Sequence, residues 1–174
     1  MKNLISRLVY GCVIGMLLLV ASGGAAAQDN PEKSGAKGDV ALKSRRATPK
    51  STDINTTVTL DGLLSKNAAD DWSTSKAAII DGYVIQLERE ADGDHHLMVA
   101  TNAGETSTTK WVIVEVTPTW SKQLASLSAG QLNNLRGKHI RVTGWLYYEQ
   151  NDASRDPRGT RWEIHPVTSI TILN

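Results

Sequence analysis

Residues 111–149 read WVIVEVTPTWSKQLASLSAGQLNNLRGKHIRVTGWLYYE, and their hydrophobic period changes twice. Residues 111–117 have apolar side chains at every second position, which is typical of a strand with one buried face. Residues 121–136 carry leucines at helical spacing, with a break near 126–130: Leu124, Leu127, Leu132 and Leu135. Gly137 is a natural helix stop, and alternation resumes over 138–149. The stretch therefore predicts a strand, a helix and a second strand.

The flanking sequence adds three more strands. Residues 79–90 and 95–101 precede the quoted stretch, and residues 160–173 follow it. Gly82, inside the first of these strands, predicts a bulge or a sharp bend. The order β-β-β-α-β-β predicts an all-β fold with one helix, an OB-fold-like five-stranded Greek-key barrel. A small β-sandwich is the alternative, but it predicts no helix between the third and fourth strands.

The first 27 residues predict a secretory signal peptide. Lys2 and Arg7 give a basic start, an apolar run extends over 8–20, and small residues at the −3 and −1 positions suit a cut after Ala27. The apolar run is shorter than the roughly 20 residues that a membrane span needs. We therefore expect a periplasmic or extracellular protein with no transmembrane segment in the mature chain.

Residues 28–57 predict a flexible polar linker. Prolines and glycines interrupt a stretch rich in Lys, Ser, Thr and Asp, which buries too little apolar surface to offset its chain entropy. Residues 58–174 contain the periodic segments, so we expect the OB-like barrel domain there. A domain of that length buries about two-thirds of its unfolded surface and needs no cross-links.

Composition excludes several kinds of chemistry. Cys12 is the only cysteine and lies within the predicted signal peptide, so the domain has no disulfide and no thiolate ligand. The full chain has 19 basic and 18 acidic residues, and removal of Lys2 and Arg7 leaves 17 against 18. This balance lacks the charge signature of a nucleic-acid-binding protein, so nucleic acid would need a local patch.

Two segments combine carboxylates with imidazoles. Period two places Asp94 with His96 on one face of a strand, and Glu163 with His165 on one face of another. This donor set suits Zn²⁺, Mn²⁺ or Fe²⁺, and with an open coordination position the ion would activate water for hydrolysis. The alternative is structural, with each histidine satisfied by a neighbouring carboxylate and no metal present. Nothing in the sequence requires a cofactor.

The same segments resemble a group of small exported bacterial proteins that pair D-x-D-x-H-L with a late W-E-I-H-P-V-T. Here the two motifs occupy residues 92–97 and 162–168, and residues 72–73, 80–84 and 141–146 match the group as well. The resemblance covers about residues 60–172. It implies an OB-like barrel and brings no activity or ligand with it. Some relatives carry cysteines after the first strand; this chain has none there, which argues against a thiol-based role.

A second candidate site is the outer surface of the barrel, where OB-folds bind single strands or oligosaccharides. Aromatic side chains beside arginines suit either ligand. The candidates are Arg141, Trp145 and Tyr147 on one face of the fourth strand, with Arg155, Arg158 and Arg161 in and after the loop at 151–159. The alternative is that the aromatics cover the barrel ends while the arginines are solvated.

The sequence contains no nucleophile elbow and no phosphate-binding glycine loop. We therefore expect an exported OB-fold-like binding protein for single-stranded nucleic acid or an oligosaccharide, with catalysis the less favoured prediction. One alternative is a metal-dependent hydrolase or nuclease that uses the His/carboxylate residues. Another is a structural accessory domain of the cell envelope that docks through exposed Trp and Tyr side chains.

Overall fold

The computed structural model of the chain describes residues 37–150 and 158–174. The predicted signal peptide at 1–27 lies outside the described residues, as do residues 28–36 of the predicted linker. Among the helices of the described ranges, none has the length and apolar character needed to cross a membrane.

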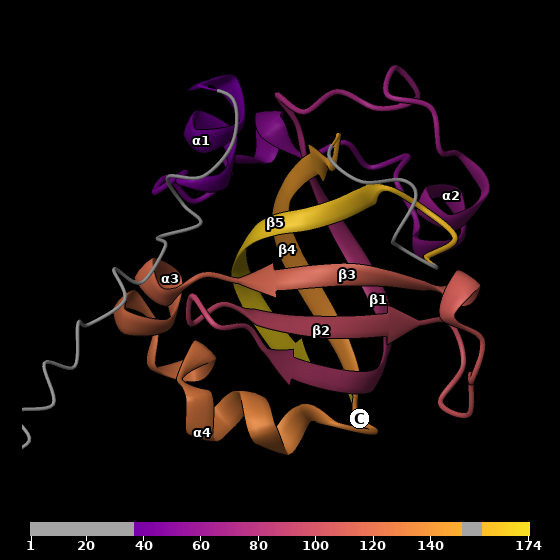
Figure 1. The fold of residues 1–174 in the computed structure, drawn as a ribbon, viewed down its shortest axis with the longest axis vertical. Coiled ribbons are helices and arrows are strands. Elements are labelled where there is room, and N and C mark those ends of the chain that lie inside the picture. The colour runs from indigo at the N-terminus through magenta and orange to yellow at the C-terminus, as the bar shows by residue number, and fades with distance from the viewer. Residues whose placement is uncertain (1–36, 151–157) are drawn as a thin grey trace, which may run out of the picture.

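Five strands close into a barrel, which Figure 1 shows with β2 and β3 in front of β4 and β5. The strands are β1 (Ala77–Arg89), β2 (His95–Ala100), β3 (Trp111–Val116), β4 (His139–Tyr148) and β5 (Trp162–Ile172). Their order around the barrel is β1-β2-β3-β5-β4, with β1 pairing β4 to close it. The β3–β5 pair is parallel and the other pairs are antiparallel. This is a five-stranded Greek-key barrel of the OB-fold type, as predicted.

The alternation of side chains divides each strand between an interior and an outer face. On β2, Leu97 and Val99 are fully buried in the barrel core, so His96 and Met98 project from the outer face. On β3, Val112 and Val114 fill the core in the same way. The outer face of these strands is therefore available for a site.

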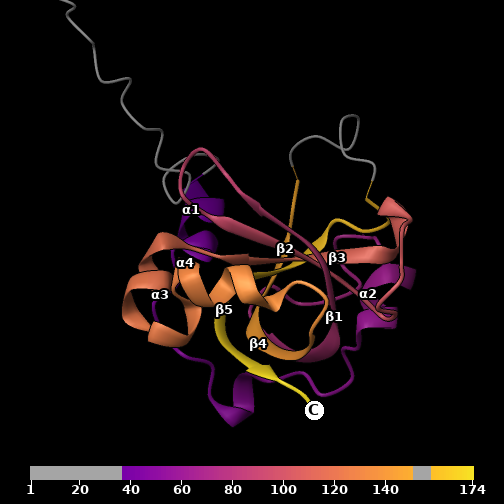
Figure 2. The ribbon, with the colours of Figure 1, turned by 90° about the horizontal axis from the view of Figure 1, so that it is seen from below.

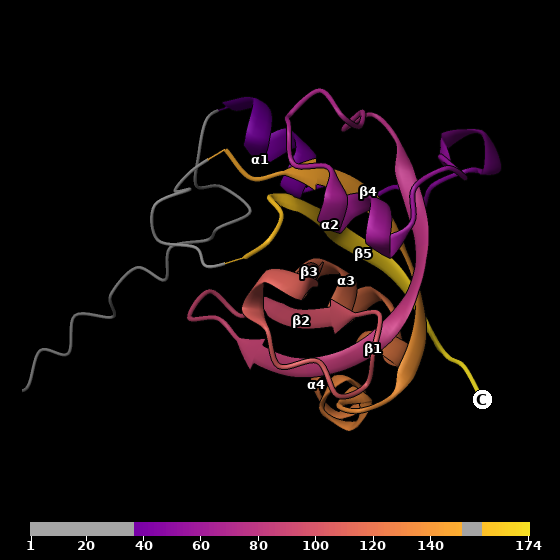
Figure 3. The ribbon, with the colours of Figure 1, turned by 90° about the vertical axis from the view of Figure 1, so that its right-hand side faces the viewer.

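Short helices close the two ends of the barrel (Figures 2 and 3). Between β3 and β4 lie α3 (Pro118–Gln123), η4 (Ala125–Leu127), α4 (Ala129–Leu132) and η5 (Asn133–Leu135), which is the predicted helical segment with its break. At the opposite end lies α2 (Leu60–Ser65), which Thr59 caps by accepting a hydrogen bond from the Gly62 amide at 3.0 Å. Leu63 of α2 and Leu132 of α4 belong to the same hydrophobic core, so the helices at both ends of the barrel pack against one core.

Gly82 has a different role from the predicted one. The register shift in β1 lies between Val84 and Gln86, so the bulge is at Ile85, three residues further along the chain. A Cβ atom at Gly82 would lie 2.6 Å from Cγ1 of Val99 and 2.9 Å from the carbonyl oxygen of Ala100. The glycine therefore permits the close approach of β1 to β2.

The prediction of a flexible linker is wrong for residues 37–57. This part of the chain contains α1 (Lys37–Lys43) and η2 (Ser51–Asp53) and packs against the barrel. The indole Nε1 of Trp120 donates to the carbonyl oxygen of Arg45 at 2.9 Å, and that of Trp145 donates to the carbonyl oxygen of Ala47 at 2.9 Å. Two buried indoles thus obtain their hydrogen-bond partners from this segment.

Candidate functional site

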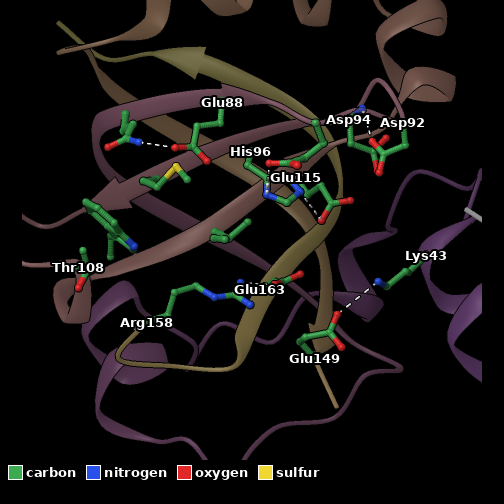
Figure 4. A pocket seen from close by; sticks show the side chains of 15 residues that line it. Lys43, Glu88, Asp92, Asp94, His96, Thr108, Glu115, Glu149, Arg158 and Glu163 are labelled. Carbon is green, nitrogen blue, oxygen red and sulfur yellow. Dashed lines mark hydrogen bonds and ion pairs between the residues drawn. The ribbon is translucent and has the colours of Figure 1, made fainter. Parts of the chain in front are cut away.

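A pocket of about 570 Å³ lies on the outer face of β1, β2 and β3 (Figure 4). The turn between β1 and β2, the start of β5 and the end of α1 also contribute to its lining. OB-folds bind ligands on this face and with the loops beside it. The acidic side chains that line the pocket are Glu88, Glu90, Asp92, Asp94, Glu115, Glu149 and Glu163, and the basic ones are Lys43, His96 and Arg158.

Glu115 is the centre of a buried polar cluster on the wall of this pocket. Strand pairing places it opposite His96 on β2, and the parallel pairing of Val114 with Ile164 brings the outer-face residues of β5 to its other side. Its Oε2 atom lies 3.3 Å from Nε2 of His96 and 2.9 Å from Nδ1 of His165. One carboxylate oxygen thus joins two imidazoles from different strands.

Glu163 completes the cluster from β5. Its Oε1 atom accepts a hydrogen bond from Nη1 of Arg158, and its Oε2 atom lies 3.8 Å from Nδ1 of His165. The potential ligand atoms of Glu115, Glu163 and His165 all lie within 4.8 Å of one another. Because these three residues are between 2% and 6% exposed, their mutual electrostatic interactions are screened little by solvent.

The cluster stabilises charged forms of its members. Burial lowers the pKa of His96 and of His165, but the contact with Glu115 and its negative charge outweigh this, giving values of about 9 and about 10. Burial raises the pKa of Glu115, yet the charge of His165 brings it well below the usual value. The ligand-free cluster therefore holds imidazolium–carboxylate pairs near neutral pH.

The pKa of Asp94, in contrast, is shifted in the direction that favours its neutral form. Burial, the contact with the Glu115 carboxylate and the charge of that group raise the pKa of Asp94 to about 8. The side chain is 2% exposed, and its Oδ1 atom has no hydrogen-bond partner among the described residues. A neutral carboxyl group therefore lies next to the charged cluster.

The four side chains that the sequence suggests as metal ligands come from β5, from β2 and from the turn before β2, and β3 lies between the two strands. Glu163 and His165 lie in one cluster with Glu115, while His96 and Asp94 contact Glu115 from β2 and the turn before it. Sequence reasoning missed Glu115 itself. The signal for it was present, because Trp111 and Ile113 share its face of β3, and two apolar side chains on an outer face indicate that this face is covered.

The two aromatic residues that the sequence suggests for an exposed stacking surface are buried. Trp145 and Tyr147 are buried, at 8% and 0% exposure, beneath the segment that follows α1. Nζ of Lys43 lies 5.0 Å from the Tyr147 ring centroid, and the Arg45 guanidinium lies 4.5 Å from the ring centroid of Trp145. These two rings are therefore not open to a ligand.

The arginines of that prediction do not form one surface. Arg141 is exposed and pairs with Asp81 on β1, where its Nη2 donates to Oδ2 at 2.7 Å. Arg161 lies over the ring of Tyr148, and Arg158 lines the pocket. Arg155 lies outside the described residues. Of the six residues, only Arg158 is therefore placed at the pocket.

The strand order defines the class of the domain as an OB-fold, and its pocket lies on the face where OB-folds bind ligands. No family model and no curated protein matches the sequence, so membership in the group with the D-x-D-x-H-L motif stays a prediction. Solved structures do resemble it. OBody AM3L09 bound to hen egg-white lysozyme is 19% identical, covering 57% of this chain and 82% of that chain, with a TM-score of 0.41.

Two further structures are similar at the same level. The S. pombe Stn1-Ten1 complex is 14% identical, covering 68% of this chain and 78% of that chain, with a TM-score of 0.44. Entamoeba histolytica asparaginyl-tRNA synthetase is 14% identical with a TM-score of 0.38, and the match covers 57% of this chain and 21% of the synthetase. At these values the likeness says nothing about ligand or activity.

Proposed function

We propose that this protein is a binding domain that holds a small, positively charged ligand in the pocket on the outer face of β1, β2 and β3. The observation that carries the proposal is the charge of the lining, which has seven carboxyl groups, with only Asp94 neutral near pH 7, against the His96 imidazolium and two side chains that are always basic, Lys43 and Arg158. Both of those bases already pair with a glutamate, Lys43 with Glu149 and Arg158 with Glu163. The lining therefore attracts a cation.

This charge argues against single-stranded nucleic acid, the first of the two ligands expected from the sequence. A strand of phosphates needs a positively charged groove, because release of its counterions supplies much of the affinity. Glu88, Glu90 and Asp92 extend the negative charge along the pocket beside the β1–β2 turn. A phosphate backbone would be repelled there.

A neutral oligosaccharide is the second candidate, and Trp111 favours it. This half-buried indole lines the pocket beside Met98 and Ile113, so the pocket combines an apolar wall with many hydrogen-bond acceptors. Sites for small organic ligands commonly have this mixture and a volume of about 300–1,000 Å³. A sugar ring would stack on the indole while its hydroxyl groups donate to the carboxylates.

Hydrolysis and docking through aromatic side chains receive less support from these contacts. A metal-dependent hydrolase needs an ion with an open position facing a bound substrate, and no contact among the described residues indicates a substrate. Docking of this kind needs exposed Trp or Tyr, and every Trp and Tyr within 37–150 and 158–174 is buried or half-buried. Residues 1–27 support export, so we infer that the pocket works outside the cytoplasm.

Isothermal titration calorimetry with four probes tests the proposal: spermidine, the glucosamine trimer, the N-acetylglucosamine trimer and a short oligothymidine. The two trimers separate charge from sugar recognition, because acetylation removes the positive charges and keeps the rings. We expect spermidine and the glucosamine trimer to bind, and their affinity to fall from about 0.05 M to about 0.5 M salt. Binding of oligothymidine alone would overturn the proposal, and equal binding of both trimers would favour the sugar.

Charge-neutral variants locate the binding. Glu88→Gln combined with Glu90→Gln removes two charges from the pocket while retaining side-chain volume, so affinity for spermidine should fall about tenfold. Asp61→Asn is the matched control, since Asp61 is exposed on α2 and does not line this pocket. Equal losses in the two variants would place the binding outside the pocket.

A further inference from the structure

We propose that Glu115, Glu163 and His165 hold one divalent transition-metal ion at the wall of the pocket. This inference rests on the proposed function, because it identifies a metal ion as a positively charged ligand of the pocket. Nδ1 of His165 lies 2.9 Å from Oε2 of Glu115 and 3.8 Å from Oε2 of Glu163. Ligands about 2.1 Å from a tetrahedral ion stand about 3.4 Å apart, so the observed separations bracket the required one.

The donor set identifies the kind of ion. One imidazole nitrogen with two carboxylate oxygens suits Zn²⁺, Mn²⁺ or Fe²⁺, whereas Mg²⁺ and Ca²⁺ prefer oxygen donors alone. Two ionised carboxylates and a neutral imidazole also balance the double charge of the ion. Three protein ligands leave a position for water or for a second donor.

Two buried polar atoms at this place have no hydrogen-bond partner among the described residues. One is Oδ1 of Asp94, on a side chain that is 2% exposed and lines the same pocket. The other is Nδ1 of His165, a residue that is also 2% exposed. Buried polar groups are rarely left without a partner, and an ion with its bound water is a common one for a carboxylate oxygen.

The orientation of the His165 imidazole also favours a metal site. Its Nδ1 atom is close to Glu115, but the two atoms do not have the alignment of a hydrogen bond. Donor atoms that surround one ion direct their lone pairs at the ion and not at one another. The approach of Nδ1 and Oε2 without hydrogen-bond alignment is therefore expected of two metal ligands.

Neighbouring side chains fix the two carboxylates in place. Arg158 holds Oε1 of Glu163, which leaves Oε2 facing His165, and His96 lies 3.3 Å from Oε2 of Glu115. Metal-binding carboxylates are typically oriented by hydrogen-bonding neighbours of this kind. Figure 4 shows Arg158 with Glu163, and His96 with Glu115, bordering the same space.

Equilibrium dialysis of the purified chain against Zn²⁺, Mn²⁺ or Fe²⁺, followed by elemental analysis, tests the inference. We expect about one ion per chain, and at least a tenfold loss of affinity in Glu163→Gln and in His165→Gln. His139→Gln is the matched control, because His139 stacks on Tyr83 at 4.5 Å, away from the cluster. Circular dichroism of each variant shows whether it is folded.

A second measurement uses only the wild-type chain. Co²⁺ in place of the native ion should give visible absorption bands of a nitrogen- and oxygen-coordinated site, and the melting temperature should rise with metal concentration. Absence of retained metal, or retention that is equal in all three variants, overturns the inference. Spermidine binding without metal binding overturns the metal centre and leaves the proposed function intact, whereas absence of both overturns the two together.

Discussion

The imidazole Nδ1 of His165 on β5 lies 2.9 Å from Oε2 of Glu115 on β3, across the parallel strand pair of the barrel. This contact joins two residues that are 50 positions apart in the sequence. Both are almost fully buried, so loss of either partner would leave a buried charge with only one opposite charge beside it, His96 for Glu115 or Glu163 for His165. The cluster around Glu115 therefore supports the barrel as well as its pocket.

The stability of the ligand-free protein should fall in alkaline solution. The pKa values of His96 and His165 are raised from 6.5 to about 9 and about 10, so the folded state holds these protons more tightly than the unfolded chain. Their contribution is complete below pH 6.5 and is lost as the pH rises through 9 to 10. We expect the free energy of unfolding, measured with urea, to fall by on the order of 2 kcal/mol between pH 7 and pH 10.

Two variants identify the groups that cause the loss of stability in alkaline solution. Glu115→Gln removes the charge that raises both values, so its stability should be lower at neutral pH and should change less with pH. His139→Gln should show the same decline as the wild-type chain. A decline that persists unchanged in Glu115→Gln would assign it to other groups.

Replacement of Asp94 by asparagine should become more favourable as the pH rises. The pKa of Asp94 is raised to about 8 from 3.8, so the folded carboxyl group keeps a proton that the unfolded chain releases. The folded state is therefore destabilised as the pH rises from 3.8 to 8, and an amide lacks this cost. The melting temperature of Asp94→Asn relative to wild type should rise by about 4 °C or more between pH 5 and pH 9.

Asp61→Asn provides the comparison for this measurement. Asp61 is exposed on α2 and lies outside the cluster, so Asp61→Asn shows the effect of the same carboxyl-to-amide change away from Glu115. If Asp94→Asn shows no trend beyond that of Asp61→Asn, then Asp94 is ionised in the folded protein and its environment is not the one described above.

The strands were predictable because their signals are local. Alternation of apolar side chains and the break in the helical segment each involve residues close together in the sequence, and each agrees with the observed elements. Gly82 predicts a bulge or a sharp bend in β1, because glycine often marks one. The true position of the bulge, between Val84 and Gln86, depends on pairing with β2, which period alone does not specify.

The site was only partly predictable, because it depends on contacts between distant strands. Asp94 with His96 and Glu163 with His165 share faces by period two, but Glu115 becomes buried only when β2 and β5 flank β3. The packing of residues 37–57 against the barrel was not predictable from the sequence, for another reason. The carbonyl groups of Arg45 and Ala47 accept the hydrogen bonds, and every residue type carries a carbonyl group.

Two glycine variants should have opposite effects on stability. Gly82→Ala places a methyl group 2.6 Å from Val99 and 2.9 Å from a backbone oxygen of β2, so it should destabilise the barrel by about 2 kcal/mol or more. Gly130→Ala adds a methyl group on α4 with nothing within 4 Å, and it should stabilise by about 0.5–1 kcal/mol through helix propensity. Urea denaturation at neutral pH measures both. Equal effects would mean that β1 and β2 are not in close contact at this point.

Alanine substitutions at the adjacent residues Arg45 and Arg46 test whether the segment that follows α1 packs against the barrel. The guanidinium of Arg45 lies 4.5 Å from the ring centroid of Trp145, whereas Arg46 is exposed. Arg45→Ala removes this cation–π contact but retains the carbonyl group that accepts from Trp120, so it should cost about 1 kcal/mol in urea denaturation. Arg46→Ala carries the same loss of charge and should change stability by less than about 0.5 kcal/mol. Equal values for the two variants would contradict the observed packing, since only a specific contact with Trp145 distinguishes one arginine from the next.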